Sequence, residues 1–230
     1  MKAIILSGGR GKRLRPLTDT IPKPLIKING VPLIEWSIRY LKNFGINDII
    51  LCTGYRSKQI EEHLSKKNNL SCKIEYSIEK EALGTGGAIK KAGKKISEKS
   101  FIVINGDIIT NINLKKIITK SNTIAAIELR TKYGTMKIKN NKIIQFNEKI
   151  TVENIWMNPG VYHLNANILK ILPKKGSLED IVFPKFAKKN SLHTIKFKNV
   201  LWHSIDSYKD IDVCSKDIKS KKYSKYFKKY

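Results

Sequence analysis

The sequence predicts a layered α/β fold built on a mostly parallel sheet. In the first half of the 230-residue chain, short apolar runs alternate with stretches whose apolar residues recur at helical spacing. Residues 101–104 are apolar throughout, which is typical of a strand that is covered on both faces. No repeat or linker interrupts the chain, so we expect one domain over residues 1–215 and a basic C-terminal tail over residues 216–230.

The elements of the first half follow one another in this alternation. The predicted strands are residues 3–6, 49–53, 73–77 and 101–104. The predicted helices are residues 32–43, 57–65 and 86–95. The first helix has an apolar face, and Gly45 is a natural stop for it.

The second half is less regular. Residues 136–139 and 142–146 flank Asn140-Asn141, a pair that fits a hairpin turn. Residues 161–164 and 201–205 have the composition of strands, and residues 178–188 that of a helix. We expect these elements to extend the same sheet and to form one side of a pocket.

The charge of the chain is its most unusual bulk property. There are 45 Lys and Arg against 19 Asp and Glu, a net charge of +26. Such a field attracts nucleic acid, anionic membranes or phosphorylated substrates. Lysine is spread along the whole chain, which favours a compositional bias over a dedicated nucleic-acid surface. The tail mixes basic and aromatic residues, so contact with RNA or a final helix stays open for it.

Several functional classes are disfavoured. The three cysteines have neither the spacing of a metal site nor that of a disulfide framework. No apolar run is long enough to cross a bilayer and no leader pattern is present, so we expect no membrane partner and a cytoplasmic location. No Ser/His/Asp or Cys/His arrangement indicates a side-chain nucleophile.

The stretch LSGGRGKRLRPLTDTIPKPL, residues 6–25, carries the strongest functional signal. Its glycines allow a ligand to approach backbone amides, which bind phosphate oxygens well. The Walker pattern fails because Arg13 follows the Gly-Lys pair, and the dinucleotide fingerprint fails because Leu14 stands in place of its third glycine. A plain surface turn explains the glycines but not Arg13 and a Lys23 held between prolines.

This stretch resembles the opening loop of sugar-1-phosphate nucleotidylyltransferases, in which Gly-Gly-x-Gly-x-Arg-Leu-x-Pro-Leu-Thr precedes Pro-Lys-Pro. Further matches follow in that family's order over nearly the whole chain. The resemblance implies a Rossmann-like three-layer α/β/α fold with a mostly parallel mixed sheet, of the nucleotide-diphospho-sugar transferase type. It also implies Mg²⁺-dependent transfer of a nucleotidyl group from an NTP to a sugar 1-phosphate, with release of pyrophosphate.

The resemblance places the nucleotide on the opening loop and on ALGTGGAI, residues 82–89. Arg13 would stabilise the leaving pyrophosphate and Lys23 the α-phosphate, so both are implied catalytic residues. Taken alone, ALGTGGAI is a weak motif that fits a plain helix start equally well. The implied nucleotide-binding residues are Leu6, Gly8, Gly9, Gly11, Arg13, Gly84 and Thr85.

Two aspartates are the implied Mg²⁺ ligands. Asp107 follows a buried strand, where a carboxylate is well placed for a cation that also binds substrate phosphates, although a lone Asp after Gly is more often a turn residue. Many family members read Trp-x-Asp-Ile-Gly, whereas this chain has Ser204 in place of that aspartate. Certain cytidylyltransferases carry the aspartate two places later, so we expect Asp206 to be the second ligand. We expect His203 to be a pocket-edge or packing residue and not a catalyst.

Three segments resemble the acceptor side of the family: YGTMKI, FNEKI and MNPGVYHL. FNEKI departs from the usual Glu-Lys-Pro because Ile150 replaces the proline, and the less favoured alternative for Glu148 and Lys149 is an exposed ion pair. The implied sugar-phosphate-binding residues are Gly134, Glu148, Lys149, Asn158 and Gly160, with Lys149 anchoring the phosphate.

The base and the sugar stay open at this point. ALGTGGAI is closest to guanylyltransferases that act on mannose- or heptose-type phosphates, whereas the Asp206 element resembles cytidylyl relatives; UTP and dTTP are not excluded. The alternatives are a transferase for another phosphorylated alcohol and a non-enzymatic polyanion-binding protein on the same fold. Bare RNA affinity needs neither the intact loop nor both aspartates, which argues against the last. The sequence predicts no oligomeric state.

Overall fold

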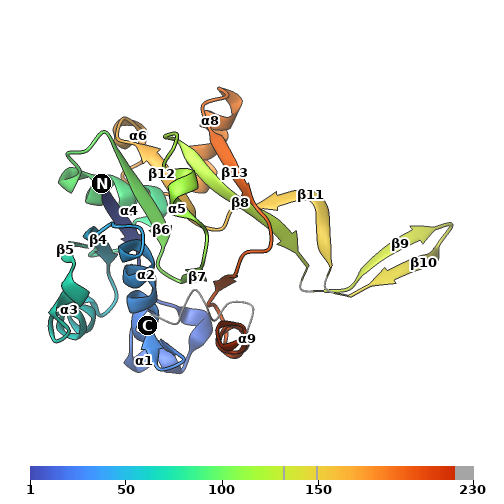
Figure 1. Ribbon diagram of the computed structural model, residues 1–230, viewed down its shortest axis with the longest axis horizontal. Coiled ribbons are helices and arrows are strands. Elements are labelled where there is room, and N and C mark those ends of the chain that lie inside the picture. Colours follow the sequence, from blue (N-terminus) through green and yellow to red (C-terminus); the bar gives the residue numbers. More distant parts are fainter. Residues whose placement is uncertain (132, 149, 221–230) are drawn as a thin grey trace.

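An eight-stranded mixed sheet forms the centre of the protein in the computed structural model, which describes residues 1–131, 133–148 and 150–220 (Figure 1). The strand order is β11-β8-β12-β6-β1-β4-β5, and β13, outside this order, pairs in parallel with β8. Strands β5, β4, β1 and β6 run parallel, whereas β12 is antiparallel to both β6 and β8. The strands are β1 (Lys2–Leu6), β4 (Asp48–Thr53), β5 (Lys73–Ile78), β6 (Ser100–Asn105), β8 (Thr123–Arg130), β11 (Thr151–Met157), β12 (Val161–Asn165) and β13 (His193–Phe197).

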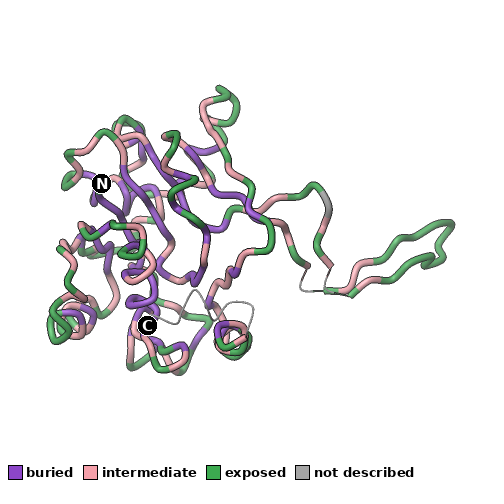
Figure 2. The backbone as a smooth tube through the Cα atoms, viewed as in Figure 1, coloured by how far each residue is buried: buried purple, intermediate pink, exposed green. Residues whose placement is uncertain are grey.

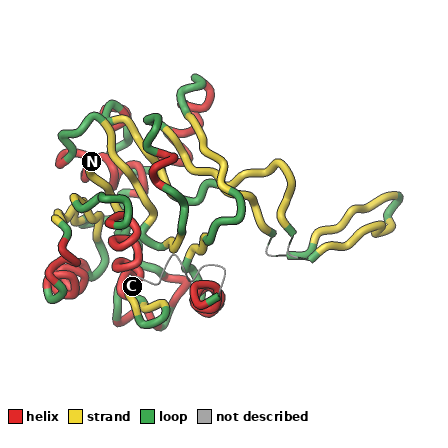
Figure 3. Tube along the Cα trace, in the orientation of Figure 1, coloured by secondary structure: helices red, strands yellow, loops and turns green. Residues whose placement is uncertain are grey.

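Side chains that alternate along β1 divide the core into two layers. Ala3 and Ile5 join one buried cluster, with Ile34 and Ile60 from the helices on that face. Ile4 joins a second cluster, to which helices on the opposite face contribute. The predicted three-layer arrangement is thus confirmed, with helices arranged around the strands (Figure 3). The helices are α1 (Leu17–Thr20), α2 (Leu33–Lys42), α3 (Ser57–Ser65), α4 (Gly84–Ala92), α5 (Leu114–Ile117), α6 (Ile168–Ile171), α7 (Leu178–Ile181), α8 (Phe183–Lys188) and α9 (Tyr208–Lys219).

A third apolar cluster packs the opening loop onto the body. Leu14 of the loop is buried there with Trp36 of α2, Ile109, Ile205 and Ile218 of α9. Residues 216–219, which the sequence groups with the basic tail, therefore form the last turn of a packed helix. Two short ladders lie nearby: β2 (Lys27–Ile28) with β3 (Val31–Pro32), and β7 (Ile108–Thr110) with β14 (Trp202–Ser204).

The predicted hairpin forms, but its predicted place is wrong. Strands β9 (Thr135–Lys139) and β10 (Lys142–Asn147) meet at Asn140-Asn141, whose φ angles of 48° and 59° suit a hairpin turn. They make a separate two-stranded sheet that projects away from the body (Figure 1). Strand β14 likewise pairs with β7 instead of joining the central sheet. Apolar alternation predicts a strand but does not specify its partner, which explains both errors.

The other differences concern segments with weak or interrupted patterns. The predicted helix at 178–188 is divided into α7 and α8, because Pro184 stands at the start of α8 and cannot continue a preceding helix. Strands β8, β11 and β13 were not predicted. Among the described residues, no helix has both the length and the apolar character needed to span a bilayer.

Glu35 is a buried carboxylate that joins α2 to α3. Its side chain is 1% exposed and contacts Arg39 at 3.1 Å, His63 at 2.8 Å and Lys67 at 2.6 Å. Burial alone would raise the pKa of Glu35, but hydrogen bonds from Lys67, His63 and Arg39 outweigh burial and hold the pKa below its ordinary value of 4.5. The ionised form therefore stabilises the fold.

We predict that Glu35→Gln lowers the free energy of unfolding by about 2 kcal/mol near neutral pH, because charge-assisted hydrogen bonds are lost. A depressed pKa stabilises the fold above the unfolded-state pKa, and that contribution is lost as pH falls through the folded-state value. In urea unfolding, the difference in free energy of unfolding between wild type and Glu35→Gln should therefore shrink as the pH falls below 4.5, the ordinary pKa of a glutamate. Glu81→Gln, in an exposed pair with Lys175, is the control and should match wild type. A pH-independent gap would contradict the prediction.

Candidate active site

The opening loop leaves the middle of the sheet at the carboxyl ends of its parallel strands. Its first amide, that of Ser7, donates to Cys52 of β4 at 2.9 Å, and the Gly106 amide after β6 donates to Leu6 at 2.8 Å. Ligands of open α/β sheets bind at such an edge. A pocket of about 280 Å³ lies there. Its lining residues are Leu6, Ser7, Gly9, Gly11, Lys12, Arg13, Leu14, Lys23, Pro24, Gly106, Asp107 and Asp206.

Close packing shapes the loop. Gly11 has a φ of 65°, and a Cβ there would lie 3.0 Å from Cβ of Lys23, so a larger residue would be both strained and crowded. The Thr18 hydroxyl donates to the Gly11 carbonyl at 3.0 Å, which fixes the turn. Lys23 begins a single 3₁₀ turn, Lys23–Leu25, with a proline on each side. These contacts hold the backbone from which the Lys23 side chain extends.

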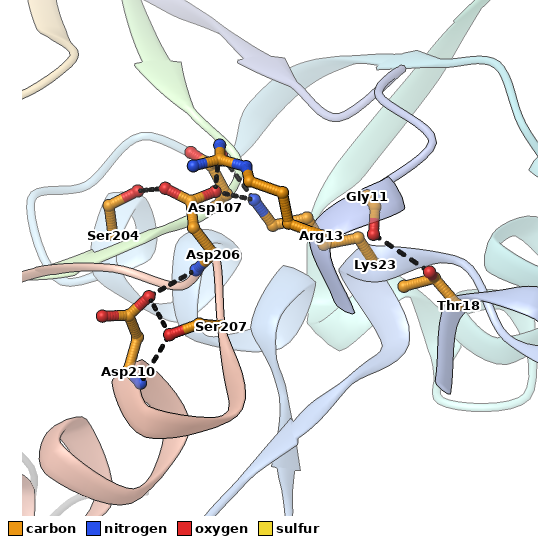
Figure 4. A network of polar contacts seen from close by, with 9 residues as sticks. All are labelled: Gly11, Arg13, Thr18, Lys23, Asp107, Ser204, Asp206, Ser207 and Asp210. Atoms are coloured by element: carbon orange, nitrogen blue, oxygen red, sulfur yellow. Dashed lines mark hydrogen bonds and ion pairs between the residues drawn. The ribbon is translucent and has the colours of Figure 1, made fainter. Parts of the chain in front are cut away.

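Four charged side chains from distant parts of the sequence meet in this pocket (Figure 4). Nζ of Lys23 lies 2.7 Å from Oδ2 of Asp107 and 2.9 Å from Oδ1 of Asp206. Nη2 of Arg13 lies 2.9 Å from the same Asp206 oxygen. The Lys23 side chain is only 11% exposed, whereas that of Arg13 is 75% exposed and faces solvent. The structure thus brings together the four residues predicted for catalysis and metal binding.

Asp206 is fixed from several sides. Ser204, at the end of β14, donates its hydroxyl to Oδ2 of Asp206 at 2.7 Å, and the Asp206 amide donates to Asp210 at 3.1 Å. Ser207 caps the start of α9 by accepting from the Asp210 amide. Burial would raise the pKa of Asp206, but hydrogen bonds from Lys23 and Ser204 outweigh burial and lower the pKa below its ordinary value. Asp206 is therefore ionised at neutral pH.

His203 makes a different contact, as predicted for a packing residue. Its Nε2 lies 2.9 Å from Oδ2 of Asp217 and so ties β14 to α9. Burial lowers the pKa of His203 in spite of the nearby Asp217 carboxylate. This histidine positions the strand that leads to Asp206.

The two carboxylates fit a hard divalent cation. Oδ2 of Asp107 and Oδ1 of Asp206 already converge on one positively charged atom, Nζ of Lys23. Within the described ranges no group of three or more His, Cys, Asp or Glu side chains could hold a metal. A site with two carboxylates needs its remaining ligands from substrate or water, which is the usual situation for Mg²⁺.

The predicted nucleotide segment at the start of α4 is packed against another loop. Gly84 has a φ of 72°, and a Cβ there would lie 2.6 Å from the Gly176 carbonyl. The Gly86 amide donates to the same carbonyl at 2.9 Å. The Thr85 hydroxyl donates to Glu179 and accepts from the Leu178 amide at 2.8 Å. Internal packing thus explains these glycines, and the Thr85 hydroxyl already has protein partners.

A chain of hydrogen bonds links this segment to the predicted acceptor side; we call it the Glu179 network. Tyr162 of β12 donates to Oε1 of Glu179 at 3.0 Å and accepts from Asn158 at 2.9 Å. Oδ1 of Asn158 accepts from the Gly160 amide at 2.9 Å. Burial raises the pKa of Tyr162, so its hydroxyl stays protonated as a donor. Gly160 lies against Asn105, because a Cβ there would be 2.5 Å from Nδ2 of Asn105.

The remaining acceptor residues are not brought to this cluster. Gly134 and Glu148 lie at the root of the projecting hairpin, where a Cβ on Gly134 would be 2.5 Å from the Phe146 ring and 3.0 Å from the Glu148 carboxylate. Lys149 lies outside the described residues.

Glu79 was missed by the sequence analysis. It follows β5 directly, and a Cβ on Gly8 would lie 2.5 Å from its Oε1. Its Oε2 accepts from the Leu83 amide at 3.0 Å. Burial raises the pKa of Glu79 above its ordinary value. The signal that pointed to Asp107, a carboxylate directly after a parallel strand, applies equally to Glu79 and could have identified it.

Comparison with known proteins agrees with this geometry. The model of the nucleotidyl transferase family matches residues 2–220. The D-glycero-α-D-manno-heptose 1-phosphate guanylyltransferase of Aneurinibacillus thermoaerophilus is 38% identical over 200 residues, covering 82% of this chain and 86% of that protein. The enzyme of the same name from Campylobacter jejuni is 37% identical over 195 residues, covering 82% and 87%. The crystal structure of HddC from Yersinia pseudotuberculosis complexed with GMP-PN matches with a TM-score of 0.74 at 32% identity, covering 95% of this chain and 99% of that one. The chain therefore belongs to the nucleotidyl transferase family, the sugar-1-phosphate nucleotidylyltransferases that its opening loop resembles.

Proposed function

We propose that this protein transfers the guanylyl group of GTP to a heptose- or mannose-type sugar 1-phosphate and releases pyrophosphate. The observation that carries the proposal is the meeting of Arg13, Lys23, Asp107 and Asp206 beside a glycine loop. Two cations that suit phosphate oxygens lie next to two carboxylates that suit a metal ion. The names of the relatives support the choice of GTP and of a heptose phosphate.

In this reaction an oxygen of the acceptor's phosphate forms a bond to the α-phosphorus of GTP. The bond from that phosphorus to the bridging oxygen of pyrophosphate breaks, and pyrophosphate leaves with the electron pair. Both reactants are anions, so the protein has to neutralise charge and align the two phosphates, and no side-chain nucleophile is needed.

Lys23 and Arg13 retain donors for these phosphates. An ammonium group has three N–H donors, and Lys23 uses one for Asp107 and one for Asp206. Arg13 has a guanidinium that faces solvent and contacts Asp206 through a single nitrogen. We assign Lys23 to the α-phosphate, because it is the more enclosed of the two, and Arg13 to the leaving pyrophosphate.

We assign Mg²⁺ to Asp107 and Asp206. When bound, Mg²⁺ supplies positive charge to phosphate oxygens while keeping a small number of protein carboxylates as ligands. The protein's own contribution is to hold both carboxylates in place. Lys23 does this for both, and Ser204 for Asp206.

Glu79 gives the base assignment a physical basis. Its carboxylate borders Gly8 and keeps Oε1 on the side of the glycine loop, while Oε2 is held by the Leu83 amide. Guanine presents two neighbouring donors, N1–H and the N2 amino group, which one carboxylate can accept together. Cytosine, uracil and thymine lack this pair, so Glu79 favours GTP.

We assign the acceptor to Asn158 and Gly160, together with Gly134, Glu148 and Lys149, the last of which lies outside the described residues. The Glu179 network holds Asn158 and Gly160 in place beside β6. Both substrates are small phosphorylated molecules, and we place the reaction in the cytoplasm.

Pyrophosphate release tests the function directly. We expect release to be fastest with GTP and mannose or heptose 1-phosphate, and to require the acceptor, when GTP, CTP, UTP and dTTP are each combined with these phosphates, glucose 1-phosphate and phosphocholine. Faster turnover with CTP would overturn the base assignment. No release with any pair would overturn the function.

We predict that Lys23→Ala slows pyrophosphate release more than tenfold at saturating substrates, because losing one preorganised contact to developing charge costs roughly 3 kcal/mol. Arg13→Ala should have an effect of the same order. Lys27→Ala removes an exposed lysine of the neighbouring β2 and is the matched control, with an expected rate equal to wild type. Near-normal rates for both loop variants would contradict the mechanism.

A second prediction concerns the two side chains joined at the end of β14. Asp206→Asn should raise the Mg²⁺ concentration for half-maximal activity and reduce the maximal rate severely, since it removes a charged ligand. Ser204→Ala removes only a hydrogen bond to Asp206 and should shift the Mg²⁺ titration slightly. If Ser204→Ala is damaging and Asp206→Asn is silent, the assignment of the ligand is wrong.

Glu79→Gln should weaken the selection of GTP over ITP, which lacks the N2 amino group but retains N1–H. We expect wild type to have the higher kcat/KM for GTP, and the variant to bring the ratio of the two values close to one by raising KM for GTP. Glu81→Gln, two residues along and exposed, is the matched control. An unchanged ratio in Glu79→Gln would show that this carboxylate does not contact the base.

A further inference from the structure

The projecting hairpin, which we call the β9–β10 arm (residues 135–147), has one apolar face and one basic face. Residues directly opposite each other in an antiparallel pair point to the same side. The register pairs Ile143 with Ile138 and Phe146 with Met136, so these four side chains share one face. The same register places Lys142 with Lys139, and Gln145 with Lys137, on the other face.

The apolar face of the arm is exposed to solvent. Its side chains and that of Ile144, which lies at the bulge of β10, are between 51% and 63% exposed. Figure 2 shows almost the whole arm as exposed, well away from the body of the protein. A two-stranded hairpin is at best marginally stable by itself in water. An amphipathic hairpin in this position therefore needs a partner surface.

We propose that the apolar face of the β9–β10 arm packs against the same face of a second copy of this chain, so that the protein is a dimer joined by its arms. A two-fold axis would place Ile138, Ile143, Met136 and Phe146 of each copy against those of the other, an isologous contact of one patch with itself. The result is a four-stranded sandwich with an apolar interior, the ordinary way in which two sheets bury one face each.

The charge suits this occupant, and the area suits a small, reversible contact. Four large side chains of the apolar face, each more than half exposed, leave roughly 100 Å² apiece to bury, so two copies bury about 800 Å², at the lower end for interfaces between proteins. Each arm carries three lysines and no acidic residue between positions 135 and 147. Lys137, Lys139 and Lys142 lie on the opposite face, so the contact leaves all of them in water and brings no like charges into the interface.

The dimer contact would also reach the acceptor side. Phe146 of the apolar face packs against Gly134, whose other close neighbour is the Glu148 carboxylate. Ordering the arm therefore orders two residues that the proposed function assigns to the acceptor. This consequence rests on the proposed function, whereas the dimer contact itself does not.

Sedimentation equilibrium of the full-length protein over a range of concentrations tests the proposal, with Ile138→Asp as the disruptive variant and Lys137→Gln as the control that changes the net charge equally. We expect wild type and Lys137→Gln to be dimers, and Ile138→Asp to be a monomer with an unchanged far-UV spectrum. Phe146→Ser should also be monomeric, which guards against an effect peculiar to a new charge. A wild type that is monomeric throughout, or an Ile138→Asp that dimerises as wild type does, would overturn the proposal.

A second measurement tests whether the apolar face of the arm binds a membrane and not a second copy of the chain. Vesicles of neutral lipid with and without anionic lipid are sedimented with wild type, Ile138→Asp and Lys137→Gln. We expect no binding that depends on Ile138. Binding that Ile138→Asp abolishes, together with a monomeric wild type, would show that the apolar face enters a lipid surface instead.

Discussion

The ammonium group of Lys23, placed between Asp107 and Asp206, is the interaction on which the site depends. Asp107 lies 84 residues after Lys23 in the sequence and Asp206 lies 183 residues after it, so the contact joins distant segments. An enclosed ammonium or carboxylate is costly to desolvate when alone, so each of the three stabilises the others' placement. Much of the surrounding architecture can be understood from this contact: Gly11 and the prolines set the backbone of Lys23, β6 delivers Asp107, and β14 ends where Asp206 can reach both.

The interaction also explains why part of the site could be read from the sequence and part could not. Asp107 follows a run that is apolar throughout, so its place at a strand end was visible. Lys23 was marked by flanking prolines and by a resemblance to a known loop. Asp206 depended on where β14 ends, because a shift of one residue in a strand turns every side chain to the other face. The family pattern at that point is itself different, and the contacts with Ser204, Lys23 and Arg13 fix the orientation of Asp206.

The parts of the fold that sequence patterns missed share a physical cause. Strands β8, β11 and β13 pair at one side of the sheet, partly antiparallel and partly exposed, where the continuous apolar run of a doubly covered strand is not required. The β9–β10 arm was predicted as a hairpin because its turn and alternation are local features. Its separation from the sheet is set by tertiary pairing, which those features do not encode. Glu179 was missed for the same reason, since its contacts to Thr85 and Tyr162 span α7, α4 and β12.

A net charge of +26 places a condition on any contact between copies of this chain. Like charges repel over a range of about 8 Å at physiological ionic strength, so an interface between two basic proteins is feasible where the lysines stay solvated and apart. The β9–β10 arm meets this condition, because its register puts every lysine on the face opposite Ile138 and Ile143. It also holds the contact away from the body of the protein (Figure 1). The same field draws in anionic substrates from solution, which favours fast association with phosphorylated molecules. Because the arm keeps the dimer contact away from the body of the protein, the chain can attract phosphorylated substrates and still form a dimer.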